Sequence, residues 1–586
     1  MILQALVSYY ESLAAKGLIA RPGWGVAKVS YALELSAAGE LLEVHSLKIE
    51  EQRDKKAVMR PREMLLPLPV KRTVGIEANF LCDNAAYILG FDGKGKPARA
   101  KACFEKAKEL HLSLLGEADN ATAKAVCAFF NNWNVACARE HALIAPIEAD
   151  MEGGANMVFI VGGAFAHEDP QIAALWQARY DEEEEGEKTR CLVTGELAHP
   201  AALHPSIKGV RDAQSSGAAL ISFNAPAFCS FGKEQNHNAP MSKYAAFAYT
   251  TALNRLIADK ERTVTIGDST VVFWAEDATT AYADAMTAFL AWDSPVMENK
   301  DLKAFMKAIA QGETADWDGA PLCPENRFYI LALAPNAARL SVRFFLQSSF
   351  GALALNIAKH YEDLKIETDN RGRFEDIPLW ALLQETVNPK ARDKKPSSQM
   401  AGDMLRAVLT GGRDPATLSQ QAQLRRRAER SVTRGRAAII KAYLLRNATN
   451  EIYKEAATVK LNEDTTYQPY ILGRMFSVLE EIQECANPGI NTTIKDKYFT
   501  SASATPAMVF PTLVNLMEKH MRKIDKPYIK TYFAKQFCAL AKAVTEDYPA
   551  HLGLQDRGIF QLGYYHQKQR RYEKKKDTEN EMGGIK

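Results

Sequence analysis

The sequence predicts an α+β fold, in which a mixed α/β N-terminal body with antiparallel strands is followed by an all-helical C-terminal bundle. Strand-like alternation of apolar and polar residues occurs up to about residue 347, and after Phe350 the periodicity is almost wholly helical. A polar, Pro-containing stretch with clustered lysines separates the two patterns. We therefore expect a body over residues 1–388, a linker over 389–398 and a helical bundle over 399–586.

The first elements of the body are a helix over 2–16, ended by Gly17, and a half-buried strand over 27–35. A strand over 41–47 is expected to pair with the first strand after the Ala38-Gly39 turn. One further helix is predicted at 244–258. Further strands are predicted at 157–161, 218–223, 264–266, 270–274, 328–334 and 341–347.

The bundle is predicted to contain an arginine-rich helix that begins at Asp414-Pro415, with Asp as the cap and Pro at the first helical position. Ile471, Met475 and Ile482 belong to a buried helical stripe farther along the chain. Later helices are expected near 508–522, 528–546 and 556–575.

The charge of the chain is unevenly distributed. The 586 residues contain 73 Lys+Arg and 71 Asp+Glu, a formal net charge of +2. Residues 391–450 alone hold 13 basic and 4 acidic side chains, a local net of +9, and the last 196 residues carry +12, which leaves −10 for residues 1–390. Arginine at this density is a usual means of binding phosphate, although a solvated helix face is an equal alternative.

No catalytic or metal site is expected. The sequence lacks a P-loop, a G-x-S-x-G motif and an H-E-x-x-H motif, and its nine cysteines form no C-x-x-C pair. Cys191, His199 and His204 could supply three metal ligands, but a structural zinc site needs four with closer pairing. We therefore expect no metal and no cofactor. The cysteine pattern favours a cytoplasmic location, and no apolar run is long enough to span a bilayer, so no membrane partner is expected.

Two polar loops, over 208–217 and 224–238, flank the strand predicted at 218–223. Their amides can donate and accept hydrogen bonds together, as a base edge does, and their lysines suit phosphates. The alternative is that these amides stabilise turns and cap the following helix. A weaker patch of similar composition contains Lys71, Arg72 and Asn79.

Several long peptides in these regions resemble one family, the large subunit of the type I-C CRISPR surveillance complex, Cascade. Among them are Ala213-Gln214-Ser215-Ser216-Gly217 and Leu333-Ala334-Pro335-Asn336. The resemblance runs from residue 2 into the Gly563-Tyr564-Tyr565-His566 segment. The other matching stretches are 2–10, 71–84, 222–228, 244–254 and 271–275.

The resemblance implies a non-catalytic subunit of a crRNA-bound complex. Such a subunit contacts the backbone and 5′-handle-binding subunits and the small subunits, tests target duplex DNA for the PAM, helps to open it, guides the displaced strand and recruits a helicase-nuclease. It also implies that residues from about 459 to 586 resemble a small subunit, which an internal start near Val459 or Met475 can release. The alternatives are a stand-alone nucleic-acid-binding protein and a metal-dependent nuclease.

Within this resemblance, three sets of residues are candidates for binding. The base-contacting set, where glycine permits close approach, is Gln214, Ser215, Ser216, Gly217 and Asn236. The phosphate-contacting set is Lys71, Arg72, Lys208, Arg211 and Lys233. The set for the displaced strand or a partner subunit is Arg425, Arg426, Arg427, Arg430 and Arg434.

Overall fold

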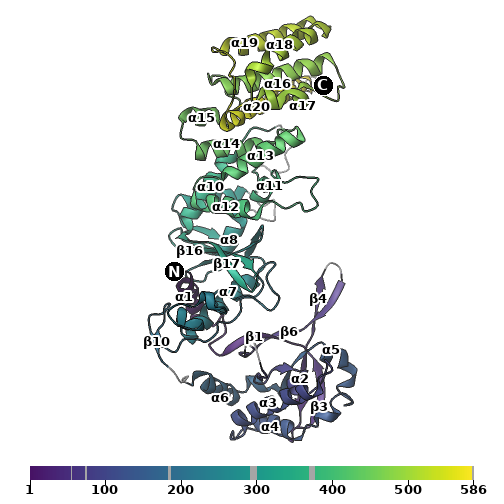
Figure 1. Ribbon diagram of the computed structural model, residues 1–586, viewed down its shortest axis with the longest axis vertical. Helices are drawn as coiled ribbons and strands as arrows, with labels where there is room; N and C mark the ends of the chain where they lie inside the picture. The colour runs from purple at the N-terminus through teal and green to yellow at the C-terminus, as the bar shows by residue number, and fades with distance from the viewer. Residues whose placement is uncertain are drawn as a thin grey trace. The chain divides into compact units, whose positions relative to one another are not determined.

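The computed structural model of the protein describes residues 1–53, 56–70, 72, 75–182, 187–290, 300–368 and 376–583. The chain divides into two compact units, and each is described by itself below. Unit 1 comprises Met1–Ile207 and Ala219–Arg255, and unit 2 comprises Lys208–Ala218 and Leu256–Lys586. Sheets occur in both units and the C-terminal region is helical, which confirms the predicted α+β class (Figure 1).

A mixed sheet forms the centre of unit 1, in the strand order β3-β2-β8-β7 with β9 beside β8. β2 pairs antiparallel with β3, as the sequence predicts, and parallel with β8. The parallel pair is an addition to the antiparallel strands expected. The strands are β2 (Tyr31–Leu35), β3 (Leu41–Ser46), β7 (Asp83–Asn84), β8 (Asn156–Val161) and β9 (Ala164–Phe165).

The single strand predicted over 27–35 is wrong, because the chain changes sheets at Ser30. β1 (Trp24–Val29) pairs with β6 (Arg62–Pro67) in a separate two-stranded sheet. The Ser30 N–H donates to the carbonyl of Asn156 at 2.9 Å, a contact with a residue far along the sequence. Another hairpin, β4 (Ile49–Arg53) with β5 (Lys56–Arg60), precedes β6.

Aromatic packing fills the core of unit 1. Phe129, Phe130 and Phe159 pack edge to face, with ring centroids 5.5 to 5.8 Å apart, and His111 stacks on Phe130 at 4.5 Å. These residues join the sheet to its helices, which gives this unit a continuous apolar core. The helices are α2 (Ala85–Ile88), α3 (Pro97–Leu115), α4 (Ala121–Asn132), α5 (Glu148–Glu152) and α6 (Pro170–Asp181).

The remainder of unit 1 is mostly irregular. α1 (Ile2–Ala15) is confirmed, and its Tyr10 packs edge to face on Phe247 of α7 (Lys243–Ala258), the helix predicted at 244–258. The strand predicted at 218–223 is wrong, since those residues form no element. Short pieces lie nearby: β10 (Thr189–Arg190), β11 (Leu197–Ala198) and the 3-10 turns Pro226–Phe228 and Gln235–Asn238.

Unit 2 begins with an antiparallel sheet in the order β12-β13-β16-β17. Every residue of β13 is buried, and the β12–β13 hairpin turns at Gly267, whose φ of +62° suits glycine. All four strands were predicted. Their bounds, with those of an additional hairpin, are β12 (Thr263–Ile266), β13 (Ser269–Ala275), β14 (Ala315–Trp317), β15 (Ala320–Leu322), β16 (Arg327–Asn336) and β17 (Arg339–Ser349).

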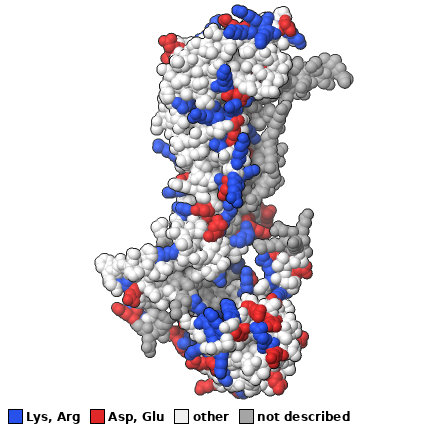
Figure 2. Space-filling model, turned by 45° about the vertical axis from the view of Figure 1, so that its right-hand side comes forward, with Lys and Arg blue, Asp and Glu red and all other residues white. Residues whose placement is uncertain are grey.

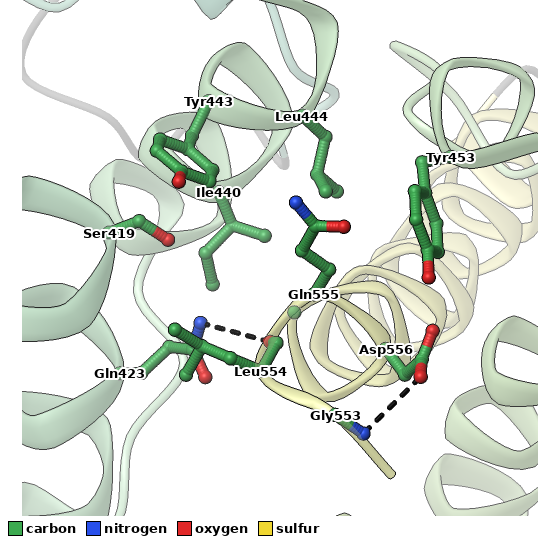
Figure 3. A pocket seen from close by; sticks show the side chains of 11 residues that line it. Ser419, Gln423, Ile440, Tyr443, Leu444, Tyr453, Gly553, Leu554, Gln555 and Asp556 are labelled. Atoms are coloured by element: carbon green, nitrogen blue, oxygen red, sulfur yellow. Dashed lines mark hydrogen bonds between the residues drawn. The ribbon is translucent and has the colours of Figure 1, made fainter. Parts of the chain in front are cut away.

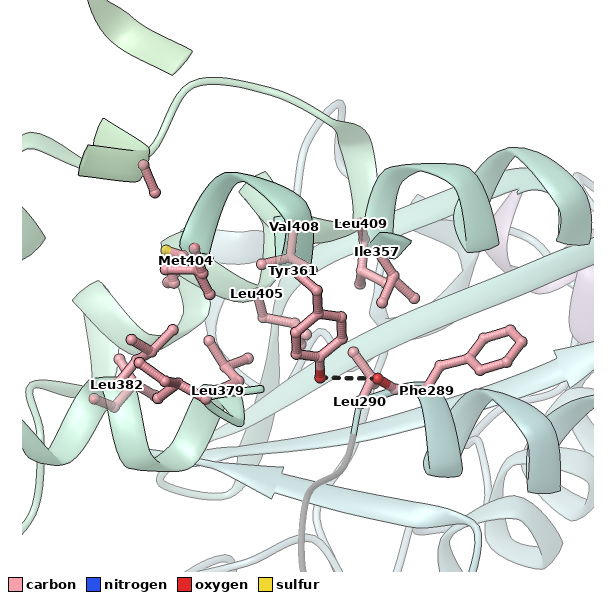
Figure 4. Packing of buried hydrophobic residues seen from close by; sticks show 14 of the residues in the cluster. Phe289, Leu290, Ile357, Tyr361, Leu379, Leu382, Met404, Leu405, Val408 and Leu409 are labelled. Atoms are coloured by element: carbon pink, nitrogen blue, oxygen red, sulfur yellow. Dashed lines mark hydrogen bonds between the residues drawn. The ribbon is translucent and has the colours of Figure 1, made fainter. Parts of the chain in front are cut away.

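Helices cover this sheet and share its core (Figure 4). Leu405 and Val408 pack with Leu379 and Ile357 around the buried ring of Tyr361, whose hydroxyl donates to the Phe289 carbonyl at 3.0 Å. The linker predicted at 389–398 lies within unit 2, and residues 389–397 form no helix or strand. The helices are α8 (Ala281–Leu290), α9 (Lys300–Ala310), α10 (Phe350–Leu364), α11 (Leu379–Gln384) and α12 (Ser398–Thr410).

The described part of unit 2 continues with helices α13 to α20, and a second apolar core contains residues of α16, α17, α18, α19 and α20. The later helices predicted near 508–522, 528–546 and 556–575 are confirmed by α18, α19 and α20. No described helix is long and apolar enough to cross a membrane. The helices are α13 (Ala416–Glu429), α14 (Arg434–Asn447), α15 (Glu451–Ala456), α16 (Gln468–Ala486), α17 (Ile494–Ala502), α18 (Pro506–Lys523), α19 (Pro527–Ala543) and α20 (Leu554–Gly583).

Asp414 does not cap α13, which corrects the helix start predicted from the sequence. Pro415 is the N-cap and no side chain bonds to the first turn. The buried carboxylate of Asp414 instead accepts a hydrogen bond from Arg446 Nη1 at 2.6 Å. Burial raises the pKa of Asp414, so the arginine is needed to keep it charged.

Two glycines allow α16 and α20 to touch. A Cβ on Gly473 would lie 2.0 Å from the Phe560 carbonyl oxygen, and one on Gly563 would lie 2.1 Å from the Tyr470 carbonyl oxygen. Because neither backbone can move away from a β-carbon cheaply, the close crossing of these helices depends on both glycines.

Candidate nucleic-acid interface

The 208–217 loop of unit 2 presents a polar tip on two apolar anchors. Val210 and Ala218 are buried at either side of the tip, and the Arg211 N–H donates to Thr270 Oγ1 on β13 at 3.0 Å. The Gly217 N–H donates to the Gln214 carbonyl at 2.9 Å and closes the turn. The loop is therefore fixed at its base.

The tip of this loop contains the predicted base-contacting residues. Gln214, Ser215 and Ser216 are exposed, and no side-chain hydrogen bond engages them within the described chain. Gly217 has a φ of +94°, a backbone conformation that favours glycine, so it also serves the turn. Free amide and hydroxyl groups on a rigid turn can form hydrogen bonds with a ligand at little entropic cost.

Two predicted phosphate-contacting residues flank the same tip. Lys208 and Arg211 are exposed, and Arg211 Nε lies 3.8 Å from the exposed Asp212 carboxylate. An ion pair of this length at the surface is weak, so the guanidinium stays available to an anion.

The 230–238 segment of unit 1 is held together by Asn238. Its Nδ2 donates to the carbonyls of Lys233 and Gln235, and its Oδ1 accepts from the Ser230 N–H. The predicted base contact Asn236 is only 4% exposed, and its Nδ2 donates to the Ala201 carbonyl at 2.6 Å. The geometry gives both asparagines structural roles, while Lys233 lies exposed at the surface.

Phe231 stands out in this segment, although the sequence predicted no role for it. Its side chain is 98% exposed, and its φ of +54° is uncommon for a residue with a β-carbon. The neighbouring Gly232 also has positive φ, at +68°. A fully exposed aromatic side chain next to an exposed lysine points to a partner that buries it. The signal in the sequence is the Ser-Phe-Gly-Lys order, in which one aromatic residue lies among turn formers.

Arg72 is engaged inside unit 1. Both terminal guanidinium nitrogens donate to the carboxylate of Asp83, which is 1% exposed, and the Arg72 guanidinium carbon lies 3.9 Å from the Tyr87 ring centroid. Burial raises the pKa of Asp83, while Arg72 and the N–H groups of Asn79 and Asn84 oppose that shift. Arg72 therefore neutralises a buried carboxylate. Lys71, the other phosphate contact predicted in this patch, lies outside the described residues.

The arginine-rich segment of unit 2 is two helices. α13 ends at Glu429, Arg430 adopts a left-handed conformation with φ +55°, and α14 begins after the Thr433 cap. Arg436 Nη2 pairs with Glu429 at 2.5 Å, which fixes the turn between the helices. Because the helix is interrupted between Glu429 and Arg434, the arginines before and after the interruption do not share one helix face.

The structure separates the predicted arginines by exposure. Arg426 is 7% exposed, and its guanidinium carbon lies 4.6 Å from the Phe499 ring centroid. Burial, and then the charges of Arg427, Arg436 and Arg557, lower the pKa of Arg426 to about 10. Arg425 is partly buried, 3.8 Å from Glu429, and Arg434 is partly buried. Arg427 and Arg430 are the exposed members of the predicted set.

A second basic surface lies at the far end of the bundle. On the face drawn in Figure 2, Lys and Arg side chains gather over the α18–α19 end of unit 2. Lys519, Arg522, Lys523 and Lys526 are exposed there, and the exposed ring of Tyr528 follows them. Basic and aromatic side chains together suit a single nucleic-acid strand.

Among the described residues, Cys191, His199 and His204 do not form a group that could hold a metal ion. His204 is buried, and its Nδ1 lies 2.6 Å from the Tyr249 hydroxyl oxygen. Cys191 accepts hydrogen bonds from the N–H groups of Ser242 and Thr194, which outweigh burial and lower its thiol pKa to about 7. In the part of the chain that the structure describes, the side chains of ligand type that do approach one another are Glu34, Glu43 and His45 on β2 and β3.

A family model described as CRISPR-associated protein (Cas_Csd1) matches residues 6–572, nearly the whole chain. No curated protein matches the chain.

Proposed function

The chain belongs to the CRISPR-associated Csd1 family and is thus a Cascade large subunit of type I-C, and we propose that it tests incoming duplex DNA for the PAM. It also helps to open the duplex, stabilises the R-loop and recruits a separate helicase-nuclease, without catalytic activity of its own. In this division of labour the guide RNA pairs with the target while the protein contacts only a few base pairs.

The exposed tip of the 208–217 loop is the observation that carries this proposal. Gln214 can form a bidentate hydrogen bond with adenine, and Ser215 and Ser216 can bond to several base edges. Lys208 and Arg211 flank the tip and suit the adjacent phosphates, which set the register of the loop on the duplex. Asn236 is left out of this set because its amide is buried and bonded.

Substitution of the loop tip tests the PAM contact. In the assembled complex, Gln214→Ala should reduce the preference for PAM over non-PAM duplex by about 1–3 kcal/mol, the usual value of one bidentate base contact. Lys208→Ala should lower the affinity for both duplexes equally, because a phosphate contact carries no sequence information. If Gln214→Ala and Ser215→Ala/Ser216→Ala leave the preference unchanged, base contact by this loop is excluded.

Duplex opening is assigned to Phe231. Proteins that kink DNA insert apolar side chains between base steps, and the exposed Phe231 ring beside Lys233 has the required chemistry. Phe231→Ala should lower the permanganate reactivity of thymines next to the PAM, while Phe231→Leu should retain part of it because an apolar wedge remains. Equal reactivity in the wild type and Phe231→Ala would remove this role.

The displaced strand is assigned to the exposed arginines Arg427 and Arg430. Each phosphate contact with a single strand contributes about −0.7 to the slope of log K against log salt concentration. The double variant Arg427→Ala/Arg430→Ala should therefore make this slope less steep by about 1.4. Arg413→Ala, an exposed arginine outside this cluster, is the control. An unchanged slope would mean that Arg427 and Arg430 face protein or solvent.

The second apolar core supports a small-subunit-like C-terminal part. It joins α16 to α20, so a product starting near Val459 would keep the whole core, including the Gly473–Gly563 crossing. A start at Met475, which lies buried within α16, would remove the first two turns of that helix, including Tyr470 and Gly473. We therefore expect the separate product, if the gene makes one, to begin near Val459, and mass spectrometry of the expressed complex identifies it.

A further inference from the structure

A cavity of about 320 Å³ lies in unit 2 among α13, α14, α15 and the start of α20 (Figure 3). This volume is at the lower end of the range for small-molecule pockets, about 300–1,000 Å³. Its wall combines apolar and aromatic groups, with Ile440, Tyr443 and Leu444 on α14 and Tyr453 on α15. A flat ring system therefore has apolar surface to pack against.

Polar groups in the cavity are not all engaged. Ser419 is 3% exposed and its hydroxyl points into the cavity, as do the amide of Gln555 and the ring of Tyr443 (Figure 3). Within the described chain, no hydrogen bond engages any of these three side chains. A ligand in the cavity can therefore form hydrogen bonds with these groups without breaking one inside the protein.

The cavity favours a neutral ligand over an anion. No lysine or arginine lines it, and its one charged side chain is Asp556. Asp556 Oδ1 accepts from the Tyr467 hydroxyl at 2.6 Å and Oδ2 accepts from the Gly553 N–H at 3.3 Å. Gln423, which also lines the cavity, donates from Nε2 to the Leu554 carbonyl at 3.4 Å.

Two arginines neighbour lining residues of this cavity along their helices. Arg427 follows Gln423 by four residues on α13, so the two side chains share a helix face. Arg557 follows Asp556 on α20, and its charge acts on Arg426 together with that of Arg427. A pocket for a flat neutral group is thus next to cations that suit phosphates.

We propose that this cavity binds one unstacked base of a single-stranded nucleic acid, whose backbone phosphates contact Arg427 and Arg557. The base packs against Tyr443 and forms hydrogen bonds with Ser419 and Gln555, as base-binding pockets do elsewhere. The inference rests on the proposed binding of the displaced strand. It adds a base contact to the phosphate contacts.

The test compares two strands and three variants of the full chain. The probes are a 20-nucleotide single-stranded DNA and the same strand with abasic sites. Tyr443→Ala should weaken binding of the base-containing strand by roughly 5- to 150-fold, the usual effect of one stacked base, and leave the abasic strand unchanged. Tyr443→Phe keeps the ring and should retain most of the affinity, whereas Arg427→Ala should weaken the binding of both strands.

The outcomes separate this inference from the function on which it rests. Equal affinity of the wild type for both strands, or an equal loss for both with Tyr443→Ala, overturns the base pocket while the Arg427 effect keeps the displaced-strand assignment. If neither strand binds, both fail. If Tyr443→Ala instead releases a protein subunit from the assembled complex, the cavity holds a protein segment and the inference is wrong.

Discussion

The Arg72–Asp83 pair distinguishes a structural arginine from a phosphate-contacting one. Asp83 is buried and accepts two guanidinium hydrogen bonds, in addition to N–H groups from Asn79 and Asn84. Arg72→Ala removes the guanidinium and leaves the carboxylate buried, a change that costs about 3–5 kcal/mol. Because the two backbone N–H groups remain, we expect a loss near the lower end, about 3 kcal/mol.

The pH dependence of this variant has a defined sign. Burial already raises the pKa of Asp83, and removing Arg72 raises it further above its unfolded value. The native state then binds a proton that the unfolded state does not, so stability falls as pH rises through this range. The defect of Arg72→Ala should therefore be smaller at pH 5 than at pH 7.

Hydrogen exchange measured by mass spectrometry suits this prediction, since a chain with two units need not unfold in one step. Peptides covering 76–90 should lose protection in Arg72→Ala, while Arg99→Ala, an exposed arginine of the same unit, should stay within about 0.5 kcal/mol of the wild type. Normal protection together with weaker DNA binding would refute the structural role and restore the phosphate contact.

Two further predictions concern the cores. Gly473→Ala should lower the free energy of unfolding by more than about 3 kcal/mol and expose α16 to proteolysis, because the new Cβ would meet a backbone oxygen. Gly402→Ala, whose Cβ would have no atom within 4 Å, should be neutral or stabilising. Equal resistance of the two variants to proteolysis would contradict the close crossing of α16 and α20. Burial lowers the pKa of His111 to about 4, and its Nε2 accepts the Leu81 N–H. As the pH falls, the unfolded state therefore binds the proton first. Between pH 7 and pH 5, unit 1 of the wild type should lose about 2 kcal/mol more stability than unit 1 of the His111→Gln variant. Hydrogen exchange measures this difference, with the exposed His237→Gln as control. Parallel pH profiles for the wild type and His111→Gln would exclude a buried neutral histidine.

Local patterns predicted the regular elements well. The strands over 264–274 and 328–347 follow from runs of β-branched and aromatic residues, which report burial on a sheet. The change of sheet at Ser30 depends on a hydrogen bond with Asn156, which no local pattern contains. Asp414 has the sequence of a helix cap, but the distant Arg446 binds its carboxylate instead.

The candidate site was less predictable, because exposure is a property of the whole fold. Residue types alone could not distinguish Arg426, which packs on Phe499, from the exposed Arg427 beside it. Asn236 and Gln214 have the same amide chemistry, yet one is buried and the other exposed. Hydrophobicity would place Phe231 in a core, whereas its turn holds it in solvent.

Photocrosslinking of target duplex to the assembled complex tests the central claim most directly. With a photoreactive base placed within the PAM, we expect adducts on peptides that contain 208–217, and their loss when the PAM sequence is scrambled. Adducts on the 230–235 segment would move base contact to unit 1. Adducts on neither loop, with the same yield for PAM and scrambled duplex, would contradict the proposal that this chain tests the PAM.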